Sequence, residues 1–365
     1  MDDSIPSLIF FDNQQADEKA NQVEAQFLHN LGETNLILGA AWSKSDRVDN
    51  ADLSLTDLSV DPPVSIPLAN GQEKYPSKDP RGYVYANIRS GDALTWILGA
   101  SYDYFEQATF KVTSFNPKLG VQWDIQPTLQ LRAAAFQMVK PALVNNSTLE
   151  PTQVAGFNQL FDDINGTKSQ RYGVALDWRA NQDVKTGVEF THRTLDEPVI
   201  DIFAGDWITE ERKEQWNRLY VDWTPSYRVA VHTELVYDQY RSQSGISTEF
   251  DNLPEKVVTW SLPVKVNYFD PTGFFAGLGA TYVDQSVQRS VNATQASGDD
   301  NFVVVDASIG YRFPKRLGIL SLAVMNLFDT EFQYQDDSYR EFRDEPSTGP
   351  YFPQRTVMVR FTLSF

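Results

Sequence analysis

Hydrophobic and polar positions alternate with a period of two along most of this chain, which is the pattern of strands with one apolar face. At the C-terminus Val357, Val359, Phe361, Leu363 and Phe365 share one face. Comparable alternation occupies seven further stretches, at 94–104, 119–125, 172–178, 184–190, 227–237, 274–282 and 303–313. The pattern predicts an all-β protein of antiparallel strands.

The connections between these stretches are of two kinds. Turn-forming residues predict short turns at 32–34, 90–92, 126–127, 181–182, 224–226, 270–273 and 314–316. Longer polar stretches lie between them, at 46–82, 141–168, 196–213, 242–256, 289–300 and 335–353. Outer-membrane barrels have this asymmetry, with short periplasmic turns and long extracellular loops. The chain is therefore predicted to be a transmembrane antiparallel β-barrel.

The short turns also give a strand count. Seven turns account for fourteen strands, one more is expected before Gln14, and the last ends at Phe365. The prediction is about sixteen strands in a single domain over 1–365, and an even number would put both termini on one side. The first residues lack the basic start and apolar stretch of a secretory signal. Either a signal was removed, or the chain is the C-terminal part of a longer protein.

Composition narrows the class of protein. The 365 residues carry a net charge of −18, which argues against non-specific nucleic-acid binding. The absence of cysteine excludes a disulfide scaffold, a zinc finger and a thiol nucleophile. No window approaches the ~18 to 20 apolar residues of a membrane helix. Aromatic residues make up 13 % of the chain, as expected where each strand has one apolar and one polar face.

The two faces suit a membrane wall. Aromatic residues sit toward the ends of apolar faces, where membrane-interface girdles occur, at Trp96, Tyr102, Tyr104, Trp123, Tyr172, Trp178, Trp223, Tyr227, Tyr237, Tyr282, Tyr311 and Phe313. The opposite faces carry charges of both signs that are expected to line a lumen, among them Arg89, Asp124, Arg179, Glu189, Arg228, Glu234 and Arg312. Unpaired charges in a dry core would cost several kcal/mol each. The alternative is a soluble β-sandwich, which would stay in solution without detergent.

Three motifs add a resemblance to a known family. The final strand, with Phe361, Leu363 and Phe365, looks like the signal read by the outer-membrane assembly machinery. Upstream lies Asn326-Leu327-Phe328-Asp329, and near the start the sequence FNPKLG, with Pro117, Lys118 and Gly120, precedes LQLRA, with Arg132. In this order the motifs resemble the barrel of TonB-dependent outer-membrane receptors.

The resemblance implies a place in the bacterial outer membrane and a role in solute binding or transport. It implies membrane lipid, lipopolysaccharide and the barrel assembly machinery as partners. Such receptors have an N-terminal plug, for which this sequence has no room before its first strand. A separate plug or periplasmic domain is therefore a further expected partner. The alternative is a barrel module of a larger export or assembly protein, working with such a plug or a periplasmic repeat domain.

The sequence offers little catalytic chemistry. His29, His192 and His232 lie on separate strands with no evident carboxylate cluster, and no nucleophile or phosphate-binding motif occurs. We expect no catalytic residues, no metal and no cofactor. The rival interpretation is an outer-membrane lipase or protease, for which His192 near Asp196 would be the place to look.

One acidic loop is the candidate ligand contact. Around its aspartates and glutamates it interleaves aromatic and basic residues, at Tyr339, Arg340, Phe342, Arg343 and Tyr351. Such a loop can fold over a lumen and contact a solute. The alternative is a solvated surface without a ligand.

Overall fold

The structure is a computed structural model that describes residues 8–57, 64–144, 147–159, 163–201, 203–243, 245–249, 253–293, 295–340 and 350–363. Fifteen strands form one antiparallel sheet and two short strands form a separate hairpin. The first strands are β1 (Leu8–Leu31), β2 (Thr34–Asp57), β3 (Val64–Ser90), β4 (Leu94–Gln107), β5 (Phe110–Gln126) and β6 (Leu129–Val139). The hairpin consists of β7 (Gln153–Val154) and β8 (Phe157–Asn158).

The sheet continues through the second half of the chain. Its strands there are β9 (Lys168–Arg179), β10 (Val184–Asp201), β11 (Asp206–Ser226), β12 (Val229–Ser242), β13 (Lys256–Phe269), β14 (Phe274–Gln288), β15 (Gly298–Arg312), β16 (Gly318–Met325) and β17 (Thr356–Leu363). Helical segments in the described ranges include α1 (Ile246–Glu249) and the 3-10 turns Pro314–Arg316 and Asp337–Arg340. None of the helices in the described ranges is long and apolar enough to cross a membrane.

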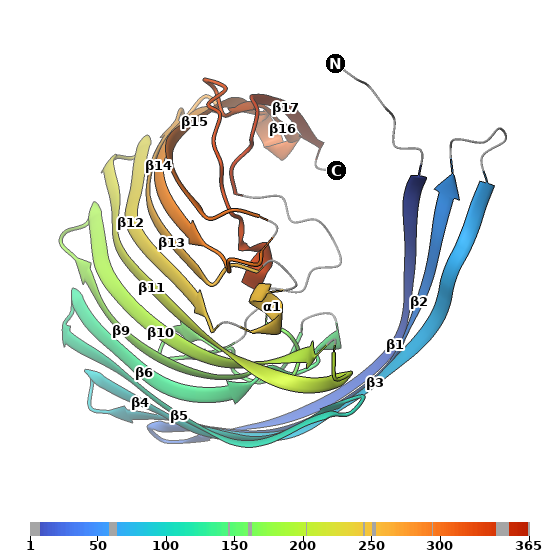
Figure 1. Ribbon diagram of the computed structural model, residues 1–365. Coiled ribbons are helices and arrows are strands. Elements are labelled where there is room, and N and C mark those ends of the chain that lie inside the picture. Colours follow the sequence, from blue (N-terminus) through green and yellow to red (C-terminus); the bar gives the residue numbers. More distant parts are fainter. Residues whose placement is uncertain are drawn as a thin grey trace.

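Each strand of the sheet pairs with its neighbours in chain order, with β6 beside β9, and β1 and β17 form its two edges. The sheet curves strongly, so that it has a convex outer face and a concave inner face (Figure 1). The predicted all-β antiparallel barrel architecture is confirmed; the described residues form seventeen strands, of which fifteen belong to the large sheet. The separate strand expected before Gln14 is instead the first part of β1, so the described sheet has an odd number of strands.

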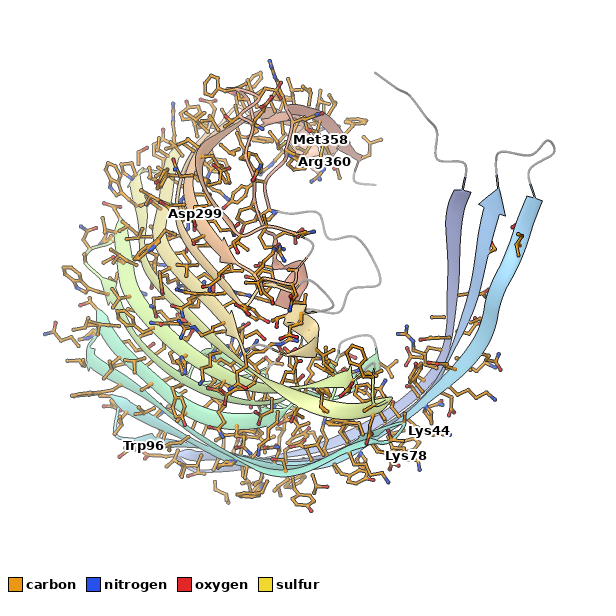
Figure 2. All side chains as sticks on the ribbon, viewed as in Figure 1. Lys44, Lys78, Trp96, Asp299, Met358 and Arg360 are labelled. Atoms are coloured by element: carbon orange, nitrogen blue, oxygen red, sulfur yellow. The ribbon has the colours of Figure 1, made fainter. Side chains whose placement is uncertain are left out.

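All seven predicted short turns join neighbouring strands. Two of the predicted long loops are wrong. The stretch 46–82 belongs largely to β2 and β3, and 196–213 is the end of β10, a short turn and the start of β11. Both stretches are rich in Asp, Glu, Pro and Gly, residues that favour loops, so their sequence predicted connections rather than strands. Backbone pairing extends β2 and β3 nonetheless: from Lys44 and Lys78, which face each other in register and are labelled in Figure 2, the pairing continues to Asp57 and Val64.

The convex face is apolar. The four predicted girdle tryptophans Trp96, Trp123, Trp178 and Trp223 are 39–49 % exposed. Large aliphatic side chains such as Leu98, Leu219, Leu278 and Val359 are exposed between them, and side chains project from both faces of the sheet (Figure 2). A soluble sandwich would bury such residues between two sheets. The outward belt is therefore the lipid-facing surface of a membrane barrel.

Candidate functional site on the inner wall

The connection between β6 and β9 folds back onto the concave wall (Figure 1). Its hairpin, β7–β8, turns through Ala155 and Gly156, which both have positive φ. Val154 and Phe157 are fully buried against the sheet. A Cβ on Gly120 of β5 would lie 2.8 Å from Val154 Cγ1, and one on Gly173 of β9 would lie 2.5 Å from the Phe157 ring. The hairpin thus packs where the wall has no side chains.

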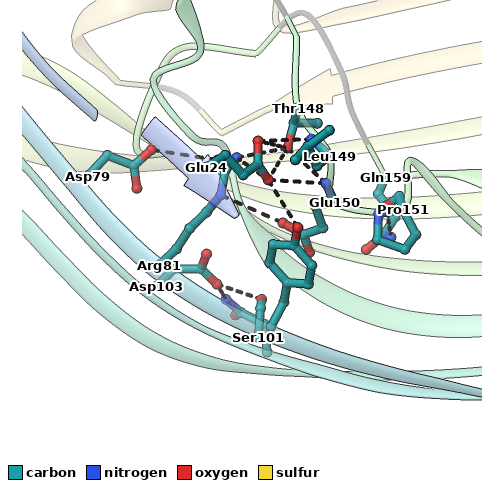
Figure 3. Close-up of polar contacts among 12 residues, drawn as sticks. Glu24, Asp79, Arg81, Ser101, Asp103, Thr148, Leu149, Glu150, Pro151 and Gln159 are labelled. Carbon is teal, nitrogen blue, oxygen red and sulfur yellow. Dashed lines mark hydrogen bonds and ion pairs between the residues drawn. The ribbon is translucent and has the colours of Figure 1, made fainter. Parts of the chain in front are cut away.

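A polar cluster holds the residues before this hairpin (Figure 3). The Glu24 carboxylate of β1 accepts hydrogen bonds from Thr148 Oγ1 (2.9 Å), the Leu149 amide (2.8 Å) and the Glu150 amide (3.2 Å). Arg81 of β3 donates to the same Thr148 hydroxyl at 2.9 Å. Hydrogen bonds to charged groups are stronger than neutral ones. The first strands of the sheet are therefore tied to a loop more than 100 residues away in sequence.

Glu150, the residue after Leu149, turns its carboxylate toward the wall. Its carboxylate accepts a hydrogen bond from the Tyr85 hydroxyl at 2.6 Å, and Lys118 Nζ and Arg81 Nε each lie 3.8 Å from it. Burial raises the pKa of Glu150 above its usual value, although the nearby cations oppose this shift. Lys118 also donates to Gln159 Oε1 at 2.6 Å. Between these groups lies a cavity of about 20 Å³, the volume of roughly one water molecule.

A ladder of charges runs across the neighbouring strands. Arg132 of β6 donates to Asp177 at 2.6 Å and lies 3.5 Å from Glu189, and its guanidinium covers the Phe157 ring. Glu189 also pairs with Arg218 of β11 at 3.3 Å, and Arg218 lies 3.9 Å from Glu234 of β12. Arginines and carboxylates alternate, so each charge on this part of the wall faces an opposite one.

The connection between β16 and β17 also folds inward. Asn326 is fully buried at positive φ; its side chain donates to the carbonyls of Thr330 (2.9 Å) and Phe352 (3.1 Å) and accepts from the Thr330 amide (2.8 Å). Asp329 accepts from the Arg355 amide at 2.7 Å. The Asn326–Asp329 motif therefore closes the turn that directs this connection toward the wall.

Aromatic and ionic contacts fix the same connection to β11, β12 and β15. Phe332 stacks on Phe302 with ring centroids 4.3 Å apart, and Tyr351 meets Phe302 edge-on at 5.6 Å. Tyr339 packs edge-on against Tyr240 at 4.7 Å, and burial raises the pKa of Tyr339 well above its usual value. Arg340 Nη2 lies 2.8 Å from both carboxylate oxygens of Asp238.

The predicted lumen residues lie at the alternate strand positions that face the inner wall. They form two groups. Glu189 and Glu234 belong to the charge ladder. The other five lie toward the short turns and are more exposed: Arg89, Asp124, Arg179, Arg228 and Arg312. Arg228 lies 3.7 Å from Asp270, and Asp124 accepts from Gln130. A role in solute passage stays a prediction for all seven.

Three of the five predicted ligand-loop residues lie in the described ranges, and all three contact the protein itself. Tyr339, Arg340 and Tyr351 make the wall contacts given above, and Phe342 and Arg343 lie outside the described residues. Three of the family-motif residues support the β6–β9 connection: Lys118, Gly120 and Arg132. Pro117 and Phe328 are exposed. The Leu327 amide donates a hydrogen bond to the Val305 carbonyl. In the terminal motif Phe361 and Leu363 face outward, and Phe365 lies outside the described residues.

Four charged residues of the inner wall and its connections were not predicted from the sequence: Glu24, Arg81, Asp163 and Glu214. Arg81 was hidden in a stretch interpreted as a loop, and the partners of the other three are distant in sequence. The three histidines stay apart, in β1, β10 and β12. His232 Nδ1 lies 2.7 Å from Asp222, its cross-strand neighbour. Within the described ranges no three His, Asp or Glu side chains gather as a metal site would require.

A curved antiparallel sheet with an apolar outer belt and a charged inner wall defines an outer-membrane β-barrel protein. Comparisons refine this class. Residues 3–169 match the family model described as TonB dependent receptor-like, beta-barrel. The resemblance indicated by the sequence motifs, and the bacterial outer membrane as the location, are thereby confirmed.

Solved structures share the fold. The ferric yersiniabactin uptake receptor FyuA from Yersinia pestis superposes with a TM-score of 0.65 at 12 % identity, covering 99 % of this chain and 56 % of that chain. The copper transporter OprC gives 0.64 at 13 % identity, covering 96 % and 57 %. The complex of FpvAI with pyocin S2 gives 0.61 at 15 % identity, covering 98 % and 50 %. This chain thus spans about half the length of these structures, and no curated protein matches its sequence significantly.

Proposed function

We propose that this protein binds a solute at the bacterial outer membrane and passes it through a barrel whose inner connections restrict the lumen. The observation that carries the proposal is the inner wall. Its ladder of alternating charges, from Arg132 to Glu234, faces away from the apolar belt, and two long connections cover part of it. Side-chain charge and free width then select the solute.

The charge ladder offers groups that can bind a solute. Arg218 is one-third exposed and lies over the rings of Trp216 and Tyr220 at about 5 Å. Its guanidinium can therefore donate to an anionic group of a solute while the rings offer apolar contact. Glu234 beside it can bind a cationic group. A solute carrying polar groups of both signs suits this wall better than one of a single sign.

The test is conductance and solute uptake of the protein reconstituted in planar bilayers and liposomes. Solute passage predicts steady ohmic conductance, or conductance that appears once the β6–β9 connection is loosened by Glu24→Gln. The matched control is Glu18→Gln, an exposed residue on the same strand. Insertion without conductance in both variants would contradict passage by this chain alone.

A second candidate keeps the barrel but adds a partner. In this alternative the chain is the barrel module of a larger export or assembly protein, and a separate plug or periplasmic domain fills or caps it. In the part of the chain that the structure describes, the outer edges of β1 and β17 pair with no other strand, which favours an additional strand or chain at the barrel wall, because free strand edges invite pairing. Conductance that appears or vanishes on adding a periplasmic fraction would support it.

The remaining expectations belong to the same proposal. Membrane lipid and lipopolysaccharide would contact the apolar belt, and the barrel assembly machinery would read the terminal strand with Phe361 and Leu363. We also propose that the protein is not an enzyme. His192→Ala should leave its function intact, whereas loss of a hydrolytic activity in that variant would overturn this part.

A further inference from the structure

One carboxylate, that of Glu214 in β11, lies between an arginine of the wall and an arginine of the β16–β17 connection. Its Oε2 accepts from Arg193 Nε at 2.9 Å and lies 2.8 Å from Arg193 Nη2. Its Oε1 lies 3.6 Å from Nε of Arg340, which belongs to the β16–β17 connection. The same side chain thus faces a wall arginine on one side and a loop arginine on the other.

Each arginine has a second carboxylate. Arg193 of β10 holds Asp163 of the β6–β9 connection through Nη1 and Nη2, both at 2.9 Å. Arg340 holds Asp238 of β12 through Nη2. These groups form a continuous ion-pair chain, Asp163–Arg193–Glu214–Arg340–Asp238. It begins in one inner connection, crosses the wall and reaches the other.

The ion-pair chain contains three carboxylates and two guanidinium groups, and these side chains are largely shielded from water. The Asp163 and Arg193 side chains are 4 % and 9 % exposed, and Glu214 is 14 % exposed. Loss of Arg340 would remove one of the cations beside Glu214, so that Glu214 and Asp163, which are like charges, would depend more on their shared partner Arg193, with Arg171 as a further cation nearby. Shielded like charges repel strongly. Release of the β16–β17 connection should therefore weaken the hold on Asp163.

We infer that the ion-pair chain couples the two inner connections, so that they are held and released together as one occluding layer. This inference rests on the proposed function, since it names how passage through the barrel is regulated. Glu214 is a positioning residue in this scheme. It acts on both connections while belonging to neither.

The absence of native cysteine makes a single engineered thiol a clean probe. Thr167 lies at the end of the β6–β9 connection, is 1 % exposed, and its hydroxyl has no hydrogen-bond partner among the described residues. Thr167→Cys is therefore a mild change that reports local opening through its labelling rate in detergent micelles. In this background Arg340→Gln, a change in the other connection, should raise the rate about threefold or more.

Two further variants serve as a negative and a positive control for the labelling rate. Arg355→Gln changes an exposed arginine near the same connection, whose carboxylate partner at 3.7 Å is Asp329 rather than Glu214; it should leave the rate unchanged. Asp163→Asn breaks the chain next to the probe and should raise the rate. Combined with Arg340→Gln, it should raise the rate by less than the product of the two single effects.

An Arg340→Gln rate equal to that of Arg355→Gln, with Asp163→Asn still fast, would overturn the coupling. If Thr167→Cys does not fold, hydrogen exchange at the Gly166 amide, which donates to the Lys140 carbonyl at 2.9 Å, supplies the readout in the cysteine-free protein. Neither measurement requires conduction. Coupling without conductance would contradict only the proposed passage, and conductance without coupling would contradict only this inference.

Discussion

Gly120 of β5 lies directly beneath Val154 of the inner hairpin, so close that a Cβ at position 120 would come within 2.8 Å of Val154 Cγ1. Gly120→Val should therefore displace the hairpin from the wall while the flanking strand pairing persists. Overpacking of this kind costs about 1–3 kcal/mol. Hydrogen exchange at 153–158 should become faster in this variant.

Gly298→Val is the matched control, because a Cβ there meets nothing within 4 Å. It should leave exchange in the hairpin unchanged. Equal exchange in both variants would mean that the hairpin does not depend on its contact with Gly120.

Docking of the residues before the hairpin should depend on pH through Glu150. Burial raises the pKa of this carboxyl in the docked state, so that state holds the proton more tightly than the free loop does. The stabilisation that this proton gives to the docked state is therefore complete below pH 4.5, the pKa of the carboxyl in the free loop. It declines as the pH rises through the raised pKa of the docked state. Tyr85, Lys118 and Arg81 are the ionisable groups that contact the carboxylate.

The measurement is the exchange protection of the Leu149 and Glu150 amides, normalised to intrinsic rates at each pH. Both amides donate to Glu24 and so report docking directly. At pH values above 4.5, the ordinary pKa of glutamate, protection should fall with rising pH in the native protein and respond less in Glu150→Gln. Protection that increased with pH would contradict the direction of the shift.

Asn326 should contribute more to the free energy of unfolding than the other residues of the Asn326–Asp329 motif. Asn326→Ala removes two donors and one acceptor from a buried turn at positive φ. We expect a loss of about 2 kcal/mol or more in the free energy of unfolding in detergent, because the freed carbonyls and amide lose their partners.

Two comparisons separate the causes of this loss. Asn326→Gly keeps the backbone freedom but loses the bonds, and Asn326→Asp keeps an acceptor for the Thr330 amide. Gly should therefore be almost as destabilising as Ala, and Asp less so. A stable Gly variant would show that backbone conformation, rather than the hydrogen bonds, makes asparagine necessary there.

The sequence predicted the sheet better than it predicted the inner site, for physical reasons. Alternation follows from a wall with lipid on one side, and short turns follow from local residue chemistry, so both are visible in neighbouring residues. The outer parts of β2 and β3 are rich in Asp, Ser and Pro, residues that favour loops in a single sequence. Glu24 and Thr148 are 124 positions apart, and no local pattern in a single sequence connects them. The motif residues Lys118, Gly120 and Arg132 were recognised, but their contact with the hairpin required the fold.

The apolar belt predicts opposite outcomes for one substitution on the two faces of β14. Leu278 is 55 % exposed on the convex face, whereas Thr281 lies three positions along and faces inward. Leu278→Arg would place a charge in lipid, which costs about 2–4 kcal/mol near the middle of a bilayer. Thr281→Arg would place the same charge among the polar groups of the inner wall. Refolding yield into liposomes should drop for the first variant and much less for the second. Equal yields would contradict the assignment of the convex face to lipid.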